Sequence, residues 1–477
     1  MPTDQTPSET GHGLQKALKA RHMRMIALGG VIGAGLFVGS GVVIQDTGPA
    51  AILSFALTGM LVVLVMRMLG EMAVAQPTVG GFYEYNRIAL GPMAGFLTGW
   101  MYWYFWIIVV ALEALAGADR LHYWFATVPK WEFTLGLMLL FTVINLLSVR
   151  SWGESEYWFA SIKVAAISIF LMLGVLVIVG LWPGIPAGFG HLTAHGGFFP
   201  KGILPMLTGA VAATGFYFGS EIVTVAAAES VEPEKAVAQA TQSVISRVLI
   251  FYLGSILVVV TILPWNAPGI VQPYVTALTA LNTPALQALT GTGQLAWISH
   301  LPGPADVMNA VILTAVLSCL NSGLFASSRM LMALSRRQDA PAFFGRISAN
   351  GVPVRAILLS TSFGFVTVFF SYLAPDTVFK FIVDSYGTVA LFVYLLIAFA
   401  QVKMRATLER TAPERLRVKM WAYPYLSYFT IGLMLLILAA MAIIPEQRSA
   451  LWFGVISAVI MWAMYLVRQR LNGSMTA

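Results

Sequence analysis

Charged side chains are scarce in this chain. Asp, Glu, Lys and Arg together make up 10% of its 477 residues, whereas hydrophobic residues make up 58%. A typical soluble domain carries about 25% charged residues. The mean hydropathy of +0.79 agrees with this contrast, so a soluble protein is excluded and the chain is expected to be embedded in a membrane.

Thiol and imidazole groups are also few. Cys319 is the single cysteine, which rules out a disulfide within the chain. The histidines all fall in expected tails or loops, so neither a buried metal cluster nor a histidine proton relay is expected. No nucleophile is paired with a base, and an enzyme is therefore not expected. The histidines are His12, His22, His122, His191, His195 and His300.

Long apolar runs are present at twelve places in the chain, if a span needs about 20 residues. The expected fold class is therefore an all-α integral membrane protein. An even number of spans places both chain ends on one side of the membrane. The spans are centred near Gly33, Leu61, Trp106, Met138, Ile169, Ala213, Ser255, Ala315, Phe363, Leu391, Met434 and Val459.

The loops on the two sides of the membrane differ in charge. Most of the 28 Lys and Arg residues fall in the two tails and in the loops on the same side as the tails. By the positive-inside rule that side is cytoplasmic, which indicates a multi-pass protein of the inner or plasma membrane. The pI of about 9.4 reflects this topology and does not indicate a nucleic-acid partner. Residues 1–22 are expected to form a cytoplasmic tail, because they lack the apolar run of a cleavable signal. The exceptions to the charge rule are Lys163 inside a span and, in the opposite loops, Arg120, Lys130, Lys201, Lys380 and Arg448.

The stretch from Gly29 to Gly41, GGVIGAGLFVGSG, places six glycines in the first expected span. Glycine lowers helix stability by about 1 kcal/mol relative to alanine, and in a bilayer an interrupted helix must line a protein cavity. We expect an unwound segment whose N–H groups at Gly33, Ala34 and Gly35 bind a carboxylate. The alternative is that these glycines serve only close helix packing.

A second interruption is expected in span six, where Gly215 and Gly219 flank aromatic residues and Glu221 lies in mid-span. Two broken spans five helices apart indicate two five-helix repeats of inverted topology, with a substrate at their shared centre. The expected organisation is a tail over 1–22, a first repeat over 23–200, a second repeat over 201–405, and spans eleven and twelve with the C-terminus over 406–477.

Three ionisable residues within spans are candidate functional groups, because charge inside a bilayer is costly. Glu113 either belongs to the site or is an acid near the outer mouth that reaches water. Lys163 either snorkels to the surface or points inward, where desolvation disfavours the charged form and makes it a reversible proton carrier. Asp384 is either a gate element or a water-exposed residue.

A polar stripe runs along span eight. Ser318, Asn321 and Ser322 follow one another at helical spacing. Such a stripe either lines a site or joins neighbouring helices by hydrogen bonds.

Two further patterns concern the ends of spans. Arg67 and Glu71 are four residues apart, so they are expected to pair along one helix face. The long outer loop over 265–303 is too polar to span the membrane. This loop either caps the outer face or has no special role.

Five stretches carry a family resemblance, which extends from about Leu14 to Trp462. Together they resemble the amino acid transporters of the amino acid-polyamine-organocation superfamily, and within it most of all the 4-aminobutyrate (GABA) permeases. The stretches are GVIGAGLFVGS at 30–40, MRMLGEMAVA at 66–75, EIVTVAAAES at 221–230, SCLNSGLFASSRML at 318–331 and ALFVYLLIAFAQVKMR at 390–405.

The resemblance implies a twelve-span transporter with spans one and six unwound and the first ten spans forming the inverted-repeat core. In such proteins the substrate carboxylate lies on the span-one backbone and the substrate amine faces span-six carbonyls. In proton-coupled relatives a lysine of span five occupies the place where sodium-coupled relatives hold the ion, and Lys163 matches this lysine. Many relatives have Thr where this chain has Ala34, so one hydroxyl ligand is missing, which is compatible with a zwitterion other than an α-amino acid.

The leading hypothesis is a proton-coupled secondary transporter that imports GABA or a similar small zwitterionic amino acid by alternating access. The amine of GABA, three methylenes from its carboxylate, is expected to approach Glu113 rather than the span-six carbonyls. Candidate substrate-binding residues are Gly33, Ala34, Gly35, Glu113, Gly215, Phe216, Tyr217, Phe218, Ser318 and Asn321. Candidate proton-coupling residues are Lys163 and Ser322, and Glu221 and Asp384 are secondary candidates.

Other functions are weighed against this hypothesis. One is a proton-coupled permease for an α-amino acid such as alanine, asparagine or proline, and a more remote one is a non-transporting amino acid sensor. A sodium symporter is disfavoured because a cationic Lys163 would occupy the place of the ion. The expected partners are a small amino acid and the lipid bilayer, without nucleic acid and without a cofactor other than coupling protons. The protein is expected to be a monomer or a weak oligomer.

Overall fold

The computed structural model describes most of the chain. The described residues are 21, 22, 25, 32–76, 78, 80–147, 149–222, 224, 244, 245, 248–284, 287, 303–373 and 375–474. Within them, the side chains of 371, 375–386, 446 and 471–474 are not described.

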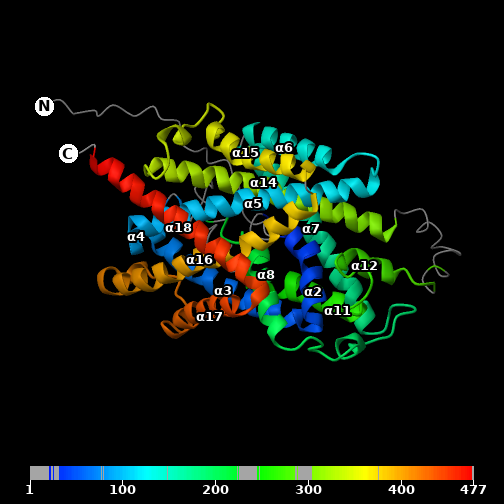
Figure 1. The fold of residues 1–477 in the computed structure, drawn as a ribbon. Coiled ribbons are helices and arrows are strands. Elements are labelled where there is room, and N and C mark those ends of the chain that lie inside the picture. Colours follow the sequence, from blue (N-terminus) through cyan, green and yellow to red (C-terminus); the bar gives the residue numbers. More distant parts are fainter. Residues whose placement is uncertain are drawn as a thin grey trace.

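Helices make up nearly all of the described chain, as predicted (Figure 1). Each predicted span centre lies in a helix, except that Gly33 lies just before one. In chain order the helices are η1 (Gly35–Gly39), α2 (Ser40–Thr47), η2 (Gly48–Ala50), α3 (Ala51–Ala75), α4 (Phe82–Leu90), α5 (Pro92–Trp124), α6 (Lys130–Leu147), α7 (Val149–Ile178), η3 (Gly190–Leu192), α8 (Leu204–Tyr217), η5 (Val248–Gly254), α11 (Ser255–Ile262), α12 (Pro273–Leu281), α14 (Pro304–Arg336), η7 (Ala342–Gly345), α15 (Val354–Leu373), α16 (Pro375–Thr411), η8 (Pro413–Arg415), α17 (Tyr425–Ile443) and α18 (Pro445–Ser474).

Several helices have the length and composition of membrane spans. Within the described residues, eight helical stretches are long and apolar enough to cross a bilayer. One of them, Gly35–Ala75, contains two predicted spans, because the chain turns at Gly48, where φ is +71°. Three shorter apolar helices complete the set, namely Leu204–Tyr217, Val248–Ile262 and Val354–Phe370.

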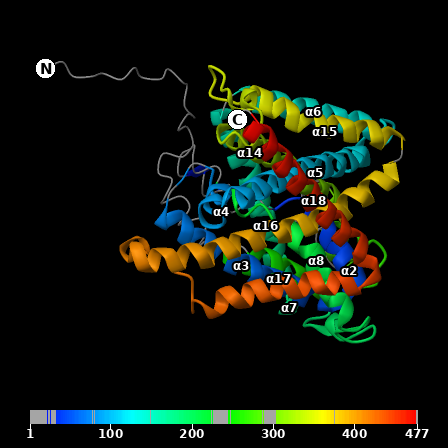
Figure 2. The same cartoon turned by 60° about the vertical axis from the view of Figure 1, so that its left-hand side comes forward.

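The two most buried of the membrane-length helices, α5 and α14, pack along each other through the middle of the molecule (Figures 1 and 2). Glycine permits this close approach. A Cβ at Gly323 of α14 would lie 2.8 Å from a methyl carbon of Val110 and 3.0 Å from the ring of Trp106, both on α5. These contacts leave no room for a larger side chain at Gly323, and α4, α6, α15, α16 and α18 pack against α5.

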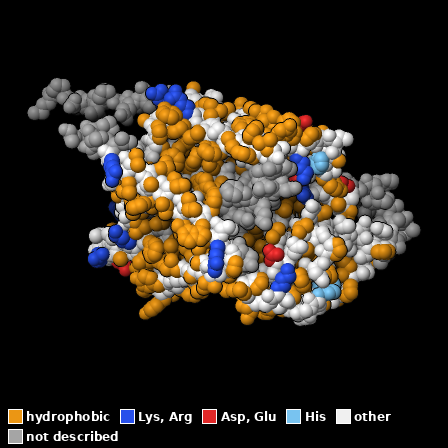
Figure 3. All heavy atoms as spheres, viewed as in Figure 1, with side chains coloured by type: hydrophobic (Ala, Val, Ile, Leu, Met, Phe, Trp, Pro, Cys, Tyr) orange, Lys and Arg blue, Asp and Glu red, His pale blue; other side chains and the backbone are white. Residues whose placement is uncertain are grey.

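The lateral surface is apolar. Hydrophobic side chains cover most of the face drawn in Figure 3. Large exposed hydrophobic residues are frequent on α7, α15, α17 and α18, for example Ile169, Phe369, Leu436 and Ile460. Exposed apolar surface on this scale is unfavourable in water and is expected where helices face lipid.

The outer loop over 265–303 is partly described, and its helix α12 packs against span one. The ring of Tyr274 lies 5.1 Å from that of Phe37 and 5.1 Å from that of Phe170 on α7. The Tyr274 hydroxyl lies 2.8 Å from Ser255 Oγ. The described part of the loop therefore packs against span one, α7 and α11.

The predicted pairing of Arg67 with Glu71 is wrong. The Glu71 carboxylate is 2% exposed and accepts hydrogen bonds from Arg405 at 2.6 Å and Gln401 at 2.8 Å, both on α16. Arg67 instead donates to the Lys419 carbonyl at 2.9 Å. The reason is burial: a carboxylate removed from water takes the donors packed around it, whereas the prediction assumed an exposed helix face.

An ionic cluster joins three elements at the end expected to face the cytoplasm. The side chain of Asp339, in the turn after α14, is fully buried and lies 2.8 Å from Arg87 of α4 and 2.6 Å from Arg468 of α18. The Tyr83 hydroxyl donates to the same carboxylate at 2.5 Å. Since α4, α14 and α18 are distant in sequence, this cluster fixes their arrangement at that end of the molecule.

Candidate substrate and coupling site

Helix α8 ends abruptly in the middle of the molecule. Phe218 leaves the helical conformation, with φ −65° and ψ 139°, and Gly219 follows with φ +114°. Only glycine adopts that φ without strain. The Glu221 carboxylate accepts a hydrogen bond from the Gly219 N–H at 2.9 Å and one from the Tyr394 hydroxyl at 3.1 Å, so a buried acid stabilises the end of the helix.

The described part of span one begins near the same depth. Ile32 and Gly33 are not helical, and the helix starts at Ala34. The Ala34 N–H donates to the Glu113 carboxylate, at 3.2 Å to each oxygen. The first amides of a helix attract a nearby anion. Gly29 and Gly30 of the predicted glycine-rich stretch lie outside the described residues.

Close packing explains several of the described glycines. A Cβ at Gly33 would lie 2.6 Å from Glu113 Oε1, and one at Gly35 would lie 2.7 Å from Phe216 Cδ1. Gly39 faces the same Phe216 ring. The absence of a side chain at these positions therefore permits close packing, which brings the helix start of span one against the end of α8.

A cavity of about 200 Å³ adjoins this contact. Its lining includes the buried Ala34 and Phe216 and the half-buried Gly35, whereas the exposed Asp46 and the half-buried Gln447 form its rim. The volume is below the roughly 300–1,000 Å³ of sites for drug-sized ligands, so it suits a small solute. The remaining lining residues are Val38, Gly39, Val42, Val43, Leu112, Ala116, Val211, Ala212, Gly387, Thr388 and Ala450.

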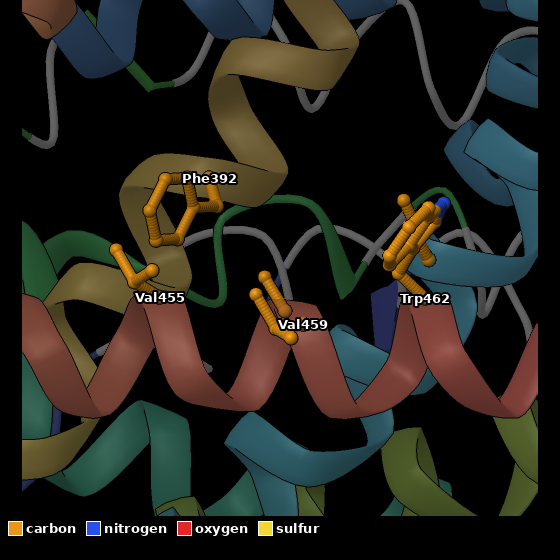
Figure 4. Close-up of a pocket in the computed structure, with 6 residues that line it drawn as sticks. Phe392, Val455, Val459 and Trp462 are labelled. Carbon is orange, nitrogen blue, oxygen red and sulfur yellow. The ribbon is translucent and has the colours of Figure 1, made fainter.

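A second hollow, of about 300 Å³, lies on the lateral surface between α5, α16 and α18. Figure 4 shows Val455, Val459 and Trp462 of α18 together with Phe392 of α16 at this hollow. All of its lining residues are apolar, the others being Leu97 and Ala458. A zwitterion would find the Trp462 indole N–H as the single polar group among these side chains and no acceptor for its ammonium, so the first cavity is the candidate site.

Lys163 is fully buried and points inward. Its Nζ donates to the Ile32 carbonyl at 2.9 Å and to Ser318 Oγ at 2.8 Å. The alternative in which Lys163 snorkels to the surface is wrong. The ammonium instead connects α7 to span one and to α14. Its contact in span one, Ile32, lies two residues before Ala34, whose amide binds Glu113.

Glu113 is 3% exposed, so the alternative of a water-facing acid is also wrong. Its carboxylate occupies the Ala34 amide, which was expected to bind the substrate carboxylate. The physical reason is that a buried acid requires hydrogen-bond donors, and the helix start supplies one.

The span-six residues have well-defined contacts. The Phe216 carbonyl accepts a hydrogen bond from the Tyr252 hydroxyl at 3.1 Å, and the Tyr217 hydroxyl donates to the Phe55 carbonyl at 3.1 Å. The Phe218 ring lies 4.2 Å from that of Phe105. Gly215 is buried in the last turn of α8.

The polar stripe of span eight divides between two roles. Asn321 joins helices: its Oδ1 accepts from Asn145 of α6 at 3.0 Å and its amide donates to Ser155 of α7 at 3.2 Å. Ser318 contacts Lys163, and Ser322 is buried one turn further along α14. None of the three lines the cavity. The side chain of Asp384 lies outside the described residues.

The sequence interpretation missed Glu156. This acid is fully buried and accepts a hydrogen bond from Ser318 Oγ at 2.6 Å. A signal was available, because Glu156 precedes Lys163 by seven residues, which places both on one face of a helix.

Comparisons with known proteins agree with this architecture. The chain matches the amino acid permease family over residues 22–473. It is 48% identical to the gamma-aminobutyric acid permease of Bacillus subtilis (strain 168) over 466 residues. The matched region covers 97% of this chain and 96% of that protein. It is 45% identical over 444 residues to the gamma-aminobutyric acid permease of Escherichia coli (strain K12), covering 92% of this chain and 91% of that protein.

Among solved structures, the fold is similar to that of a manganese transporter of Eremococcus coleocola. The TM-score is 0.56, at 12% sequence identity and 97% coverage of both chains. At this identity the similarity concerns the fold alone. The all-helical membrane architecture and the full-length family match lead to one conclusion: the chain belongs to the amino acid permease family, whose members are transporters and not enzymes.

Proposed function

We propose that this permease imports GABA, or a similarly small zwitterionic amino acid, together with protons by alternating access. The observation that carries the proposal is the buried ammonium of Lys163, which contacts the Ile32 carbonyl two residues before the Ala34 amide. The GABA permeases with 48% and 45% identity support the choice of substrate.

The proposed architecture has twelve spans and cytoplasmic termini. Residues 23–200 and 201–405 form two inverted five-helix repeats, and spans eleven and twelve lie outside them. The end of α8 and the helix start in span one meet at Phe216, Gly35 and Gly39, which supports a substrate site at the centre of the two repeats.

The substrate carboxylate binds the amides of Gly33, Ala34 and Gly35 after it displaces Glu113. The displaced Glu113 carboxylate then lies close to the bound GABA. It can contact the amine of GABA, which is separated from the GABA carboxylate by three methylenes. The carbonyls at the end of α8 provide the second contact for this amine. In the absence of substrate, Glu113 satisfies the Ala34 N–H, which otherwise would be a costly unpaired group.

Coupling follows from the differential contacts of Lys163. A protonated Lys163 bridges span one at Ile32 and span eight at Ser318. This bridge stabilises the outward-open state, in which the cavity opens near Asp46. Loss of the proton weakens both hydrogen bonds and releases span one. Proton and substrate thus act on the same two-state equilibrium.

The test is uptake of labelled GABA into proteoliposomes under an imposed pH gradient, with and without sodium. We expect accumulation that depends on the pH gradient, does not require sodium, and is inhibited by unlabelled GABA more strongly than by alanine, asparagine or proline. Accumulation that requires sodium would contradict proton coupling. Stronger inhibition by one of the α-amino acids would contradict the choice of GABA.

A further inference from the structure

The geometry points to Glu156 as a second proton-carrying group, which receives through Ser318 the proton that Lys163 releases. This inference rests on the proposed proton coupling at Lys163. It adds a residue and a direction to that coupling.

Glu156 and Lys163 lie on one face of α7. They are seven residues apart, which is about two helical turns or 10 Å along the axis. Both side chains are fully buried. Glu156 is the one nearer to the start of α7, the end expected to face the cytoplasm.

A continuous hydrogen-bonded chain joins the two side chains. Lys163 Nζ donates to Ser318 Oγ at 2.8 Å, and Ser318 Oγ donates to Glu156 Oε1 at 2.6 Å. A hydroxyl that accepts from a cation and donates to a carboxylate is oriented for proton transfer in that direction. Ser318, which belongs to α14, supplies this link between two residues of α7.

The second oxygen of Glu156 is unusual. Among the described residues, Glu156 Oε2 makes no hydrogen bond of regular distance and angle, although the side chains of Ser322 and Asn321 on α14 lie close to this carboxylate. Buried polar atoms are nearly always paired, and exceptions often have a functional reason. A carboxylate that is held by only one of its oxygens retains the capacity to take up a proton.

Few charged or titratable groups surround this chain in the described residues. Lys163 on α7, Cys319 on α14 and Glu113 on α5 lie on its inner side. Glu154, two residues before Glu156, is one-third exposed and pairs with Arg21. Lys163 is therefore the cation with which Glu156 exchanges a proton.

The proton transfer balances without another reactant. An N–H bond of the Lys163 ammonium breaks as an O–H bond forms on Ser318. The original O–H bond of Ser318 breaks as an O–H bond forms on Glu156. The net result is a neutral amine, an unchanged serine and a carboxylic acid, and the acid then loses its proton to the cytoplasm.

The experiment uses the full-length protein in proteoliposomes and compares Glu156→Gln, Glu156→Asp and Glu154→Gln. Two quantities are measured: accumulation of labelled GABA driven by a pH gradient, and exchange of labelled for unlabelled GABA without a gradient. Glutamine can still accept the Ser318 hydrogen bond, so Glu156→Gln is expected to retain exchange and to lose accumulation at least about tenfold. Glu156→Asp is expected to restore part of the accumulation, and Glu154→Gln is the matched control on the same helix.

The outcomes separate the inference from the proposed function. Wild-type accumulation by Glu156→Gln would overturn the role of Glu156 and leave proton coupling intact. Loss of exchange together with accumulation in both Glu156 variants would show a structural role only, and would also overturn it. If the wild-type protein exchanges GABA but does not respond to the pH gradient, proton coupling itself is wrong and this inference is wrong with it.

Discussion

At the scale of single residues, the proposed site is built from buried ionisable groups that are held by hydrogen bonds. Lys163, Glu113 and Glu156 are each 3% exposed or less, and each has a hydrogen bond to the backbone or to Ser318. Isolated charges would be very costly at this depth. Substitution of one of these three residues is therefore expected to affect transport in a way that a substitution on the surface does not.

We expect Lys163→Ala to abolish concentrative uptake while exchange partly survives. The variant removes the bridge between Ile32 and Ser318 but leaves the Ala34 amide in place. The internal and external concentrations of labelled GABA should become equal in a proteoliposome assay under a pH gradient. Lys130→Ala, at a residue half-exposed and paired with Asp119, is the control, and normal accumulation by Lys163→Ala would exclude the residue as the coupling site.

Glu113→Gln should weaken GABA binding about tenfold or more. A hydrogen bond to a charged group contributes about 1.5–3 kcal/mol, and about 1.4 kcal/mol corresponds to a factor of ten in affinity. Glutamine still accepts from the Ala34 N–H but has no charge for the substrate amine. The measurement is the concentration dependence of uptake, with Glu132→Gln, an exposed position on α6, as control. An unchanged affinity for GABA would remove Glu113 from the substrate site.

At the scale of secondary structure, apolar runs and glycines predicted the helices well. Each predicted span centre lies in a helix or directly before one, because lipid requires that backbone groups pair within the helix. The end of α8 was expected from Gly215 and Gly219. The partners of the polar groups were harder to predict: Glu71 pairs with Arg405, which lies more than three hundred residues away. Such contacts depend on which helices are neighbours, and one sequence contains no direct signal for that.

The contact between span one and α8 makes a prediction at this scale. Gly35→Ala places a methyl group 2.7 Å from Phe216, and overpacking of this kind costs about 1–3 kcal/mol. We expect reduced GABA uptake and a lower unfolding temperature in detergent.

Gly136→Ala is the matched control for this change. Gly136 lies within α6, and a Cβ there would contact nothing within 4 Å. This variant should keep wild-type uptake. Equal behaviour of the two variants would show that the close approach of Gly35 to Phe216 does not matter for transport.

At the scale of the whole molecule, the two ends differ. One end has a cavity with Asp46 and Gln447 at its rim. At the other end, α4, α14 and α18 are held together by the cluster around Asp339. Alternating access requires that such contacts break in each cycle, so their strength should affect both stability and transport.

Asp339→Asn should destabilise the protein by about 1–3 kcal/mol. Breaking a buried ion pair costs about 3–5 kcal/mol, but Arg87 and Arg468 are 24% and 23% exposed and are partly solvated. Thermal unfolding in detergent measures the change. Asp119→Asn, which removes a largely exposed pair with Lys130, should change stability by less than about 1 kcal/mol, and equal losses in the two variants would contradict this account of the cluster.

The position of Tyr274 has a consequence for pharmacology. Its ring lies between Phe37 of span one and Phe170 of α7, so in the proposed alternating-access cycle α12 travels with span one or detaches from it. A nanobody bound to α12, on the side expected to face outward, would therefore slow this cycle without competing for the amino acid. Inhibition by this nanobody is expected to lower the maximal rate of uptake and to leave the half-saturating concentration of the amino acid unchanged.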